Sequence, residues 1–162
     1  MLVQFKKKRD GTNTLHCVRD DGTATGQRQD GVFFVLHDLG HYAIETTLGL
    51  RGGFYGILAR GWDIGDFGTP WPRGPIPPDA VDDATLAEHL AGMLDGERAN
   101  SLPPMEAAEL NIVLAAQFEQ AGRTLHRPLT DGELGQIRAT VAQLSECWRA
   151  LPPGETLTLP FP

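Results

Sequence analysis

The pattern of apolar and polar residues predicts strands at the start of the chain. β-Forming residues dominate positions 2–5 and 14–18, and these segments lead into Asp-Gly turns at 10–11 and 21–22. Strand-like segments separated by Asp-Gly dipeptides are typical of antiparallel hairpins. Residues 1–30 are therefore predicted to form a β-meander.

A largely apolar helix is predicted to follow the meander. Residues 31–48 are apolar on nearly every side of a helix, with Asp30 as a candidate N-cap and Gly49 as the stop signal. A helix that is apolar nearly all round belongs inside a domain. Residues 31–61 are therefore expected to hold a central buried helix and a short helix packed closely against it.

A Gly/Pro-rich loop and three amphipathic helices are predicted next. Residues 62–80 are rich in glycine and proline, and a loop of this length in a compact domain is usually functional, so we expect it to cover a pocket. Residues 81–151 carry apolar residues at helical spacing in three segments. Asp83 is the predicted cap of the first helix, and Thr130 and Glu133 form a capping box for the third.

The end of the chain is predicted to return to the sheet. Residues 155–160 alternate like a strand and are expected to pair with the N-terminal meander. A chain of 162 residues is long enough for one domain with a real core. The predicted fold class is α+β, a small antiparallel sheet packed beside a helical body with a buried central helix.

Charge is distributed unevenly along the chain. Residues 1–30 have a net charge of +2 and the remainder −9, which gives −7 in total. An acidic body argues against nucleic acid as a partner, because phosphate binding requires dense positive charge. The basic run at 6–9 is interpreted either as a small anion-binding patch or as the solvated end of an edge strand, where lysines prevent aggregation.

Cysteine usage and hydropathy indicate the compartment. No stretch has 18 consecutive apolar residues or a signal-peptide layout, so we expect a cytoplasmic protein without membrane contact. Cys17 and Cys147 form no CxxC pair, which argues against a thiolate zinc site and fits a reducing compartment. Cys147 is expected to be an inert core residue on the inward face of its helix.

Four ionisable residues share one face of the apolar helix. At about 100° per residue, His37, Asp38, His41 and Glu45 fall within about a quarter of its circumference. Burying such groups is costly unless they meet one another, a metal, water or a substrate. This stripe is therefore the predicted functional site.

The spacing of the two histidines predicts metal binding. His37 and His41 are four residues apart, so both imidazoles project to one side of the helix as a chelating pair. In the zinc-peptidase pattern HExxH, the acid after the first histidine is the general base. Asp38 occupies that position here and, with Glu45, is a candidate proton acceptor.

The third metal ligand is expected from another element. Glu45 lies about 12 Å along the helix axis from His37, so three ligands from this helix would be strained. Glu45 is instead expected to orient His41 or to pair with Arg51 or Arg60. The candidate third ligands are Asp63, Asp66, His16, His89 and His126.

Two functions are consistent with this stripe. The first is a protein that holds a divalent metal, zinc by preference, and hydrolyses a small-molecule or peptide ligand through metal-bound water, with Asp38 or Glu45 accepting the proton. The second is a non-enzymatic module in which the stripe is a structural hydrogen-bond network and the surface binds a protein partner. Only the first requires bound metal.

Two resemblances involve the same residues. Residues 35–41, VLHDLGH, resemble the metal-binding centre of HD-domain phosphohydrolases, which implies phosphoester hydrolysis with His37 and Asp38 as metal ligands. HD domains are all-helical, whereas a β-meander is predicted here before the motif. The longer pattern HDLxHYxxE with GLRGGFYGILARGW, over residues 37–62, resembles a family of small bacterial proteins without an established activity. That resemblance implies that His37, Asp38, His41 and Glu45 act as a unit.

Overall fold

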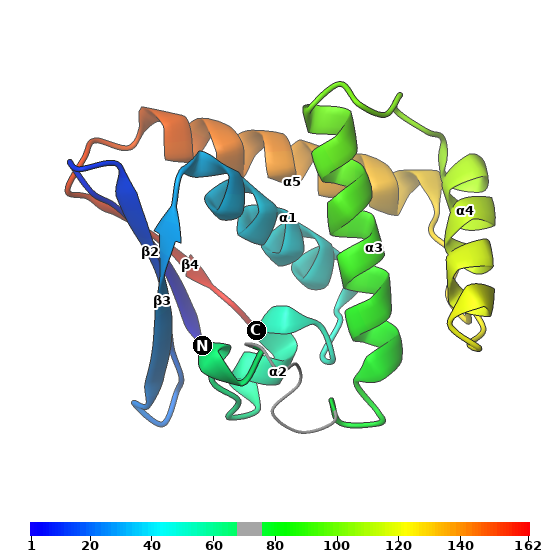
Figure 1. Cartoon of the computed structure of the whole chain (residues 1–162), viewed down its shortest axis with the longest axis horizontal. Helices are drawn as coiled ribbons and strands as arrows, with labels where there is room; N and C mark the ends of the chain where they lie inside the picture. Colours follow the sequence, from blue (N-terminus) through cyan, green and yellow to red (C-terminus); the bar gives the residue numbers. More distant parts are fainter. Residues whose placement is uncertain (68–75) are drawn as a thin grey trace.

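The computed structural model describes residues 1–67 and 76–162 and contains a four-stranded antiparallel sheet (Figure 1). The strand order is β3-β2-β1-β4. The first three strands form the predicted meander, and the C-terminal strand pairs with β1. The strands are β1 (Leu2–Lys7), β2 (Thr12–Val18), β3 (Ala24–Asp30) and β4 (Thr156–Pro160).

Six helical segments in the described residues complete an α+β fold, as the sequence predicts. α1 lies in the middle of the molecule, with the sheet on one side, α3 on the other and α5 running across it (Figure 1). The helices are α1 (Val32–Leu48), α2 (Phe54–Ala59), the 3-10 helix η1 (Ile64–Phe67), α3 (Val81–Arg98), α4 (Ala107–Gln120) and α5 (Asp131–Ala150). Part of the predicted loop, residues 68–75, lies outside the described residues.

The core consists of two hydrophobic clusters, and α1 contributes to both. One cluster fills the space between α1, the sheet, α2 and the C-terminal half of α5, with Phe5, Leu39 and Trp148 among its buried members. The other lies among α1, α3, α4 and the N-terminal half of α5, around Ile44 and Leu114. The central position predicted for α1 is confirmed. Its first turn is the exception, because Val32, Phe33 and Phe34 are each half exposed.

Helix capping follows the sequence in some places and departs from it in others. The capping box of Thr130 and Glu133 begins α5 as predicted, and Gly49 ends α1 with a positive φ of 66°. The predicted cap at Asp30 is wrong, because the chain turns through Gly31 at φ 81° and the Asp30 carboxylate pairs with Arg28 instead.

The predicted cap at Asp83 is also wrong. α3 begins at Val81, so Asp83 lies inside its first turn. Its carboxylate accepts the backbone N–H groups of Arg51 (3.0 Å) and Gly52 (2.8 Å) and therefore fixes the start of α3 against the α1–α2 connection.

Lys7, in the basic run at residues 6–9, stabilises the end of a helix. β1 lies between β2 and β4, so the edge-strand interpretation of this run is wrong. The Lys7 ammonium donates hydrogen bonds to the carbonyl oxygens of Trp148, Arg149 and Leu151 at 3.0–3.2 Å. A positive charge at a helix C-terminus is favourable, because it meets carbonyl groups without intrahelical partners.

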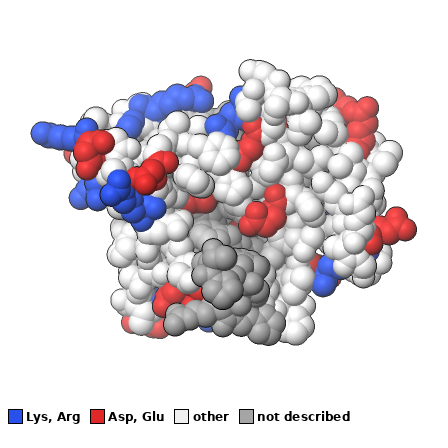
Figure 2. Space-filling model, viewed as in Figure 1, with Lys and Arg blue, Asp and Glu red and all other residues white. Residues whose placement is uncertain are grey.

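The surface carries the expected charge asymmetry. Most of the Lys and Arg side chains on the face in Figure 2 gather at upper left, over the sheet, whereas acidic side chains lie both among them and over the remainder. None of the described helices is long and apolar enough to cross a membrane.

The two cysteines differ in environment. Cys17 is fully buried, whereas Cys147 is exposed, so the prediction that Cys147 is a core residue is wrong. Burial raises the pKa of the Cys17 thiol to about 12. The thiolate is the reactive form, and only Cys147 is accessible to reagents in the folded protein.

We therefore expect one thiol per chain to react with dithiobis(nitrobenzoate) in the native protein and both thiols to react after denaturation. Cys147→Ser should abolish the native reaction, and Cys17→Ser should leave it unchanged. Absorbance at 412 nm measures the reaction. Equal rates for the two thiols in the native protein would contradict the burial of Cys17.

Candidate metal centre

The two histidines of α1 face each other one turn apart. The Nε2 atoms of His37 and His41 are 3.2 Å apart, and the two rings meet edge to face. The His41 side chain is 3% exposed and that of His37 is 25% exposed. The predicted chelating pair is therefore formed, with its Nε2 atoms toward a common point.

Glu88, on α3, is the third potential ligand at this point. Its Oε1 atom lies 3.7 Å from the Nε2 atom of His41. One ligand atom from each of His37, His41 and Glu88 can be chosen so that all three lie within 4.8 Å of one another. The Glu88 side chain is 64% exposed, so the group is formed by two buried or half-buried rings and one carboxylate at the surface.

An acidic residue on α3 holds the outer side of the His37 ring. The Nδ1 atom of His37 lies 2.7 Å from Oδ2 of Asp95, and Arg98 donates a hydrogen bond to Oδ1 of the same carboxylate at 2.8 Å. The hydrogen bond to Asp95 raises the pKa of His37. Burial opposes ionisation of Asp95, but the hydrogen bonds from His37 and Arg98 outweigh it and lower the pKa of Asp95.

Glu45 lies on the outer side of the His41 ring. Its Oε1 atom is 3.8 Å from Nδ1 of His41. The carboxylate accepts the backbone N–H groups of Tyr55 (3.2 Å) and Gly56 (3.0 Å), at the N-terminus of α2. Glu45 thus lies beside His41 as expected, whereas its expected pairing with Arg51 or Arg60 is replaced by these backbone contacts.

The arrangement of ring nitrogens fits either a bound metal or a metal-free network. Nδ1 of His37 is hydrogen-bonded to Asp95, so a neutral His37 ring has its proton on Nδ1 and its lone pair on Nε2. A proton on Nε2 of His41 would satisfy this lone pair in a metal-free network, and a metal bound to both Nε2 atoms would satisfy it in a metal site. Among the described residues, Nδ1 of His41 is buried without a hydrogen-bond partner, and rotation of Glu45 toward it would supply one.

Close packing explains the glycines of the GGFYG segment, and Gly53 packs against Glu45. A Cβ atom at Gly53 would lie 2.4 Å from the Glu45 carboxyl carbon, and one at Gly56 would lie 2.4 Å from the backbone oxygen of Arg51. Gly52 meets the backbone of Ala80 in the same way, at 2.5 Å. The prediction that small residues permit close contact between the helices is confirmed.

Asp38 faces the sheet rather than the histidine pair. Its carboxylate accepts a hydrogen bond from the Gln29 amide on β3, and its backbone carbonyl accepts one from the Tyr55 hydroxyl. Burial raises the pKa of Asp38 to about 6, although the nearby His41 and His37 oppose the shift. A carboxyl group that titrates near neutral pH can take up or release a proton there.

The expected third ligands lie elsewhere. Asp63 pairs with Arg19, and Asp66 accepts the backbone N–H of Asp63. His89 packs against Phe118, and the other two candidates, His16 and His126, are exposed. Glu88 was missed because its sequence signal is that of an ordinary solvent-facing helix residue, and only the docking of α3 against α1 brings it to the histidines.

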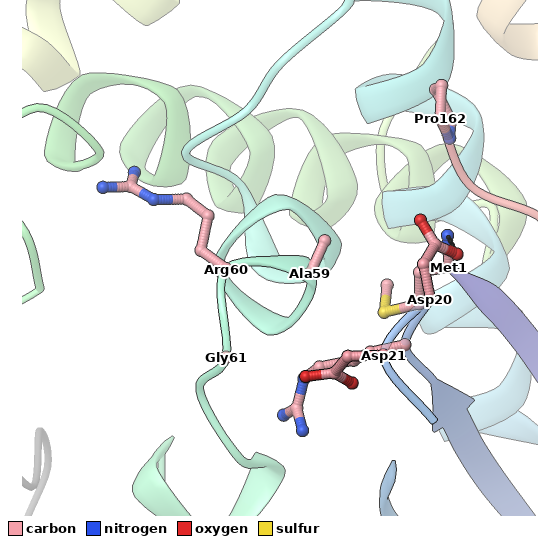
Figure 3. Close-up of a pocket in the computed structure, with 8 residues that line it drawn as sticks. Met1, Asp20, Asp21, Ala59, Arg60, Gly61 and Pro162 are labelled. Carbon is pink, nitrogen blue, oxygen red and sulfur yellow. Dashed lines mark ion pairs between the residues drawn. The ribbon is translucent and has the colours of Figure 1, made fainter. Parts of the chain in front are cut away.

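A pocket lined by both acidic and basic residues lies near both ends of the chain (Figure 3). Its Arg60 side chain points away from Asp20 and Asp21 and pairs with Asp79 at 3.0 Å. The Arg19 guanidinium is bonded to Asp63 and to the backbone carbonyls of Leu58 and Trp62. These charges do not converge on a common point, in contrast to those at the histidine pair.

Comparisons with known proteins place this geometry in no characterised group. No protein-family model matches the chain, and neither the curated proteins nor the solved structures contain a match. The case for function therefore rests on the chemistry of the site.

Replacing Gly53 should destabilise the protein, because the added methyl group collides with the Glu45 carboxyl, which is held by two backbone N–H groups. We expect Gly53→Ala to lower the free energy of unfolding by about 1–3 kcal/mol, the usual cost of overpacking. Urea denaturation followed by tryptophan fluorescence measures it.

The matched control is Gly92→Ala on α3, where a Cβ atom meets nothing within 4 Å. This change should be neutral or stabilise by up to about 1 kcal/mol, because alanine favours the helix. Equal effects of the two substitutions would contradict the close contact at Glu45.

The pKa of Asp38 makes the stability of the metal-free protein depend on pH. Its folded-state pKa of about 6 exceeds the ordinary aspartate value of 3.8, so its contribution to stability is complete below about pH 4 and is lost as pH rises through 6. A shift of this size corresponds to about 3 kcal/mol. The raised pKa of His37 acts in the same direction at higher pH.

Asp38→Asn cannot ionise and still accepts from Gln29. In the presence of a chelator, we expect this variant to be more stable than the parent at pH 8 and to lose that advantage toward pH 4. Urea midpoints at pH 4.5, 6 and 8 measure the difference. A variant that is less stable than the parent by the same amount at every pH would show that ionisation of Asp38 is not costly.

Proposed function

We propose that the protein binds a divalent transition metal, with zinc the preferred ion, through His37, His41 and Glu88, and uses it for hydrolysis. The observation that carries the proposal is the pair of Nε2 atoms 3.2 Å apart, each on a ring whose Nδ1 faces a carboxylate. Metal-binding histidines are commonly oriented by a carboxylate in this way.

The ligand distances support zinc. Zn–N bonds of 2.0–2.1 Å at a tetrahedral angle put two nitrogen ligands about 3.3 Å apart, and the two Nε2 atoms lie 3.2 Å apart. The Glu88 oxygen, 3.7 Å from Nε2 of His41, needs to move only slightly, and its side chain is exposed enough to do so. Two histidines and one glutamate leave a fourth position for water, as in catalytic zinc sites.

In this proposal, acidic residues near the histidine pair orient the two rings. The bound metal would make water nucleophilic near neutral pH. Asp95, which accepts a hydrogen bond from Arg98, orients His37, and Glu45 orients His41. Of the two predicted proton acceptors, Asp38 has a pKa of about 6 but faces the sheet and is bonded to Gln29, and Glu45 is already held by two backbone N–H groups.

A metal-free hydrogen-bond network is the second candidate, and the raised pKa of His37 favours it. A doubly protonated His37 ring would donate from Nδ1 to Asp95 and from Nε2 to His41. The stripe would then fix the packing of α1 against α3, and the protein would act as a binding module for a protein partner. Metal content separates this candidate from the first.

The deciding experiment is elemental analysis of protein purified without a histidine tag and dialysed in metal-free buffer, followed by calorimetric titration with zinc. We expect about one equivalent of zinc per chain. His37→Ala with His41→Ala should abolish uptake and retain the fold, because the ligands bind metal rather than hold the core. Glu88→Gln should weaken zinc binding at least tenfold.

Two further variants test specificity. Asp95→Asn keeps all three ligands and should weaken zinc binding 10–100-fold through loss of the partner of His37. His126→Ala and Glu119→Gln change exposed residues of the same types and should have no effect. Less than a tenth of an equivalent, without tight uptake on titration, would reject the metal site and favour the network.

A further inference from the structure

A small apolar pocket lies beside the candidate metal centre. It is formed by α2, η1, α3 and the residue at position 76, and five of its six described lining residues are apolar. None of the six carries a positive charge. The lining residues are Phe54, Ile57, Phe67, Ile76, Ala84 and Glu88.

The pocket and the metal centre share a residue. Glu88 lines the pocket and lies 3.7 Å from Nε2 of His41. Phe54 forms another wall, and its ring centroid is 6.1 Å from that of His41. A ligand atom bound to the metal would therefore have an apolar cavity next to it.

Coordination of a metal by Glu88 would make this pocket less polar. Glu88 is its only polar side chain among the described lining residues, and a bound metal would neutralise and engage that carboxylate. The remaining walls are aromatic and aliphatic, which favours burial of an apolar group at roughly 25 cal/mol per Å². A phosphate group would find no cationic side chain among those walls.

We propose that this pocket binds the apolar acyl group of the substrate, so that the substrate class is an ester or amide of an apolar carboxylic acid. The inference rests on the proposed metal-dependent hydrolysis. Water adds its oxygen to the acyl carbon, the bond from that carbon to the leaving oxygen or nitrogen breaks, and the leaving group departs with a proton. The products are the carboxylic acid and an alcohol or amine.

Alkyl hydroxamates test the pocket directly, because the hydroxamate group chelates zinc and the alkyl chain enters any adjacent cavity. Acetohydroxamate and hexanohydroxamate differ by four methylene groups. On the zinc-loaded protein, we expect hexanohydroxamate to bind at least tenfold more tightly, because those methylenes leave water. Isothermal titration calorimetry measures both affinities.

Ala84→Phe should fill the pocket from α3. We expect this variant to bind zinc and acetohydroxamate within about threefold of the parent and to lose the preference for the longer chain. Ala84→Leu is a smaller change with the same expected direction, and it provides the test if the phenylalanine disturbs folding. Ala115→Phe, an exposed change on α4, should retain the preference.

The outcomes separate the two proposals. Failure to bind zinc overturns the proposed function. Binding of zinc and acetohydroxamate without any gain for hexanohydroxamate leaves the metal centre intact and overturns the acyl pocket. A gain that persists in both Ala84 variants also overturns it, because the chain then binds elsewhere.

Discussion

The free-energy cost of burying ionisable side chains on α1 is the constraint on which the rest of the structure depends. Asp38, His41 and Glu45 are each less than a tenth exposed, on a helix whose other buried positions are almost all apolar. Isolated charges cannot remain there, so each group requires a partner from another element. The neighbours of α1 are therefore fixed by polar contacts as well as by apolar packing.

The polar groups of α1 contact different neighbouring elements of the fold. Asp38 is bonded to Gln29 of β3, Glu45 to the N-terminus of α2, and the histidines meet Asp95 and Glu88 of α3. Contacts to backbone N–H groups at a helix N-terminus suit a carboxylate well, since those donors otherwise lack partners. Glu45 consequently holds α2 in place and also lies beside His41.

Local sequence signals predicted those features whose cause is local. The capping box of Thr130 and Glu133 and the stop at Gly49 depend on residues a few positions apart, and both were predicted correctly. Asp30 and Asp83 have the same cap-forming chemistry, but one pairs with Arg28 and the other binds the connection from α1 to α2. The tertiary fold determines which groups these two carboxylates contact, so a capping rule alone could not predict their partners.

The same distinction applies to the candidate metal centre. The pairing of His37 with His41 follows from helical periodicity and was predicted. Glu88 and Asp95 lie about 50 residues further along the chain, and seven positions separate them on α3. Seven residues are two helical turns, so both carboxylates project to one side of α3. Once α3 docks against α1, one acid meets the outer face of His37 and the other the shared point of the two rings.

A candidate functional site is best sought where a buried polar group lacks a hydrogen-bond partner. The contacts of Glu45 fix one end of α1, and a protonated Asp38 removes the cost of a buried charge at the sheet. The His37–His41 pair differs, because Nδ1 of His41 is buried without a hydrogen-bond partner among the described residues and the adjoining carboxylate of Glu88 is at the surface. In the proposed metal site, a cation would reach this point from solvent and bind both Nε2 atoms. An unsatisfied polar group of α1 thus lies beside a carboxylate at the surface, which is why we propose the ion site there.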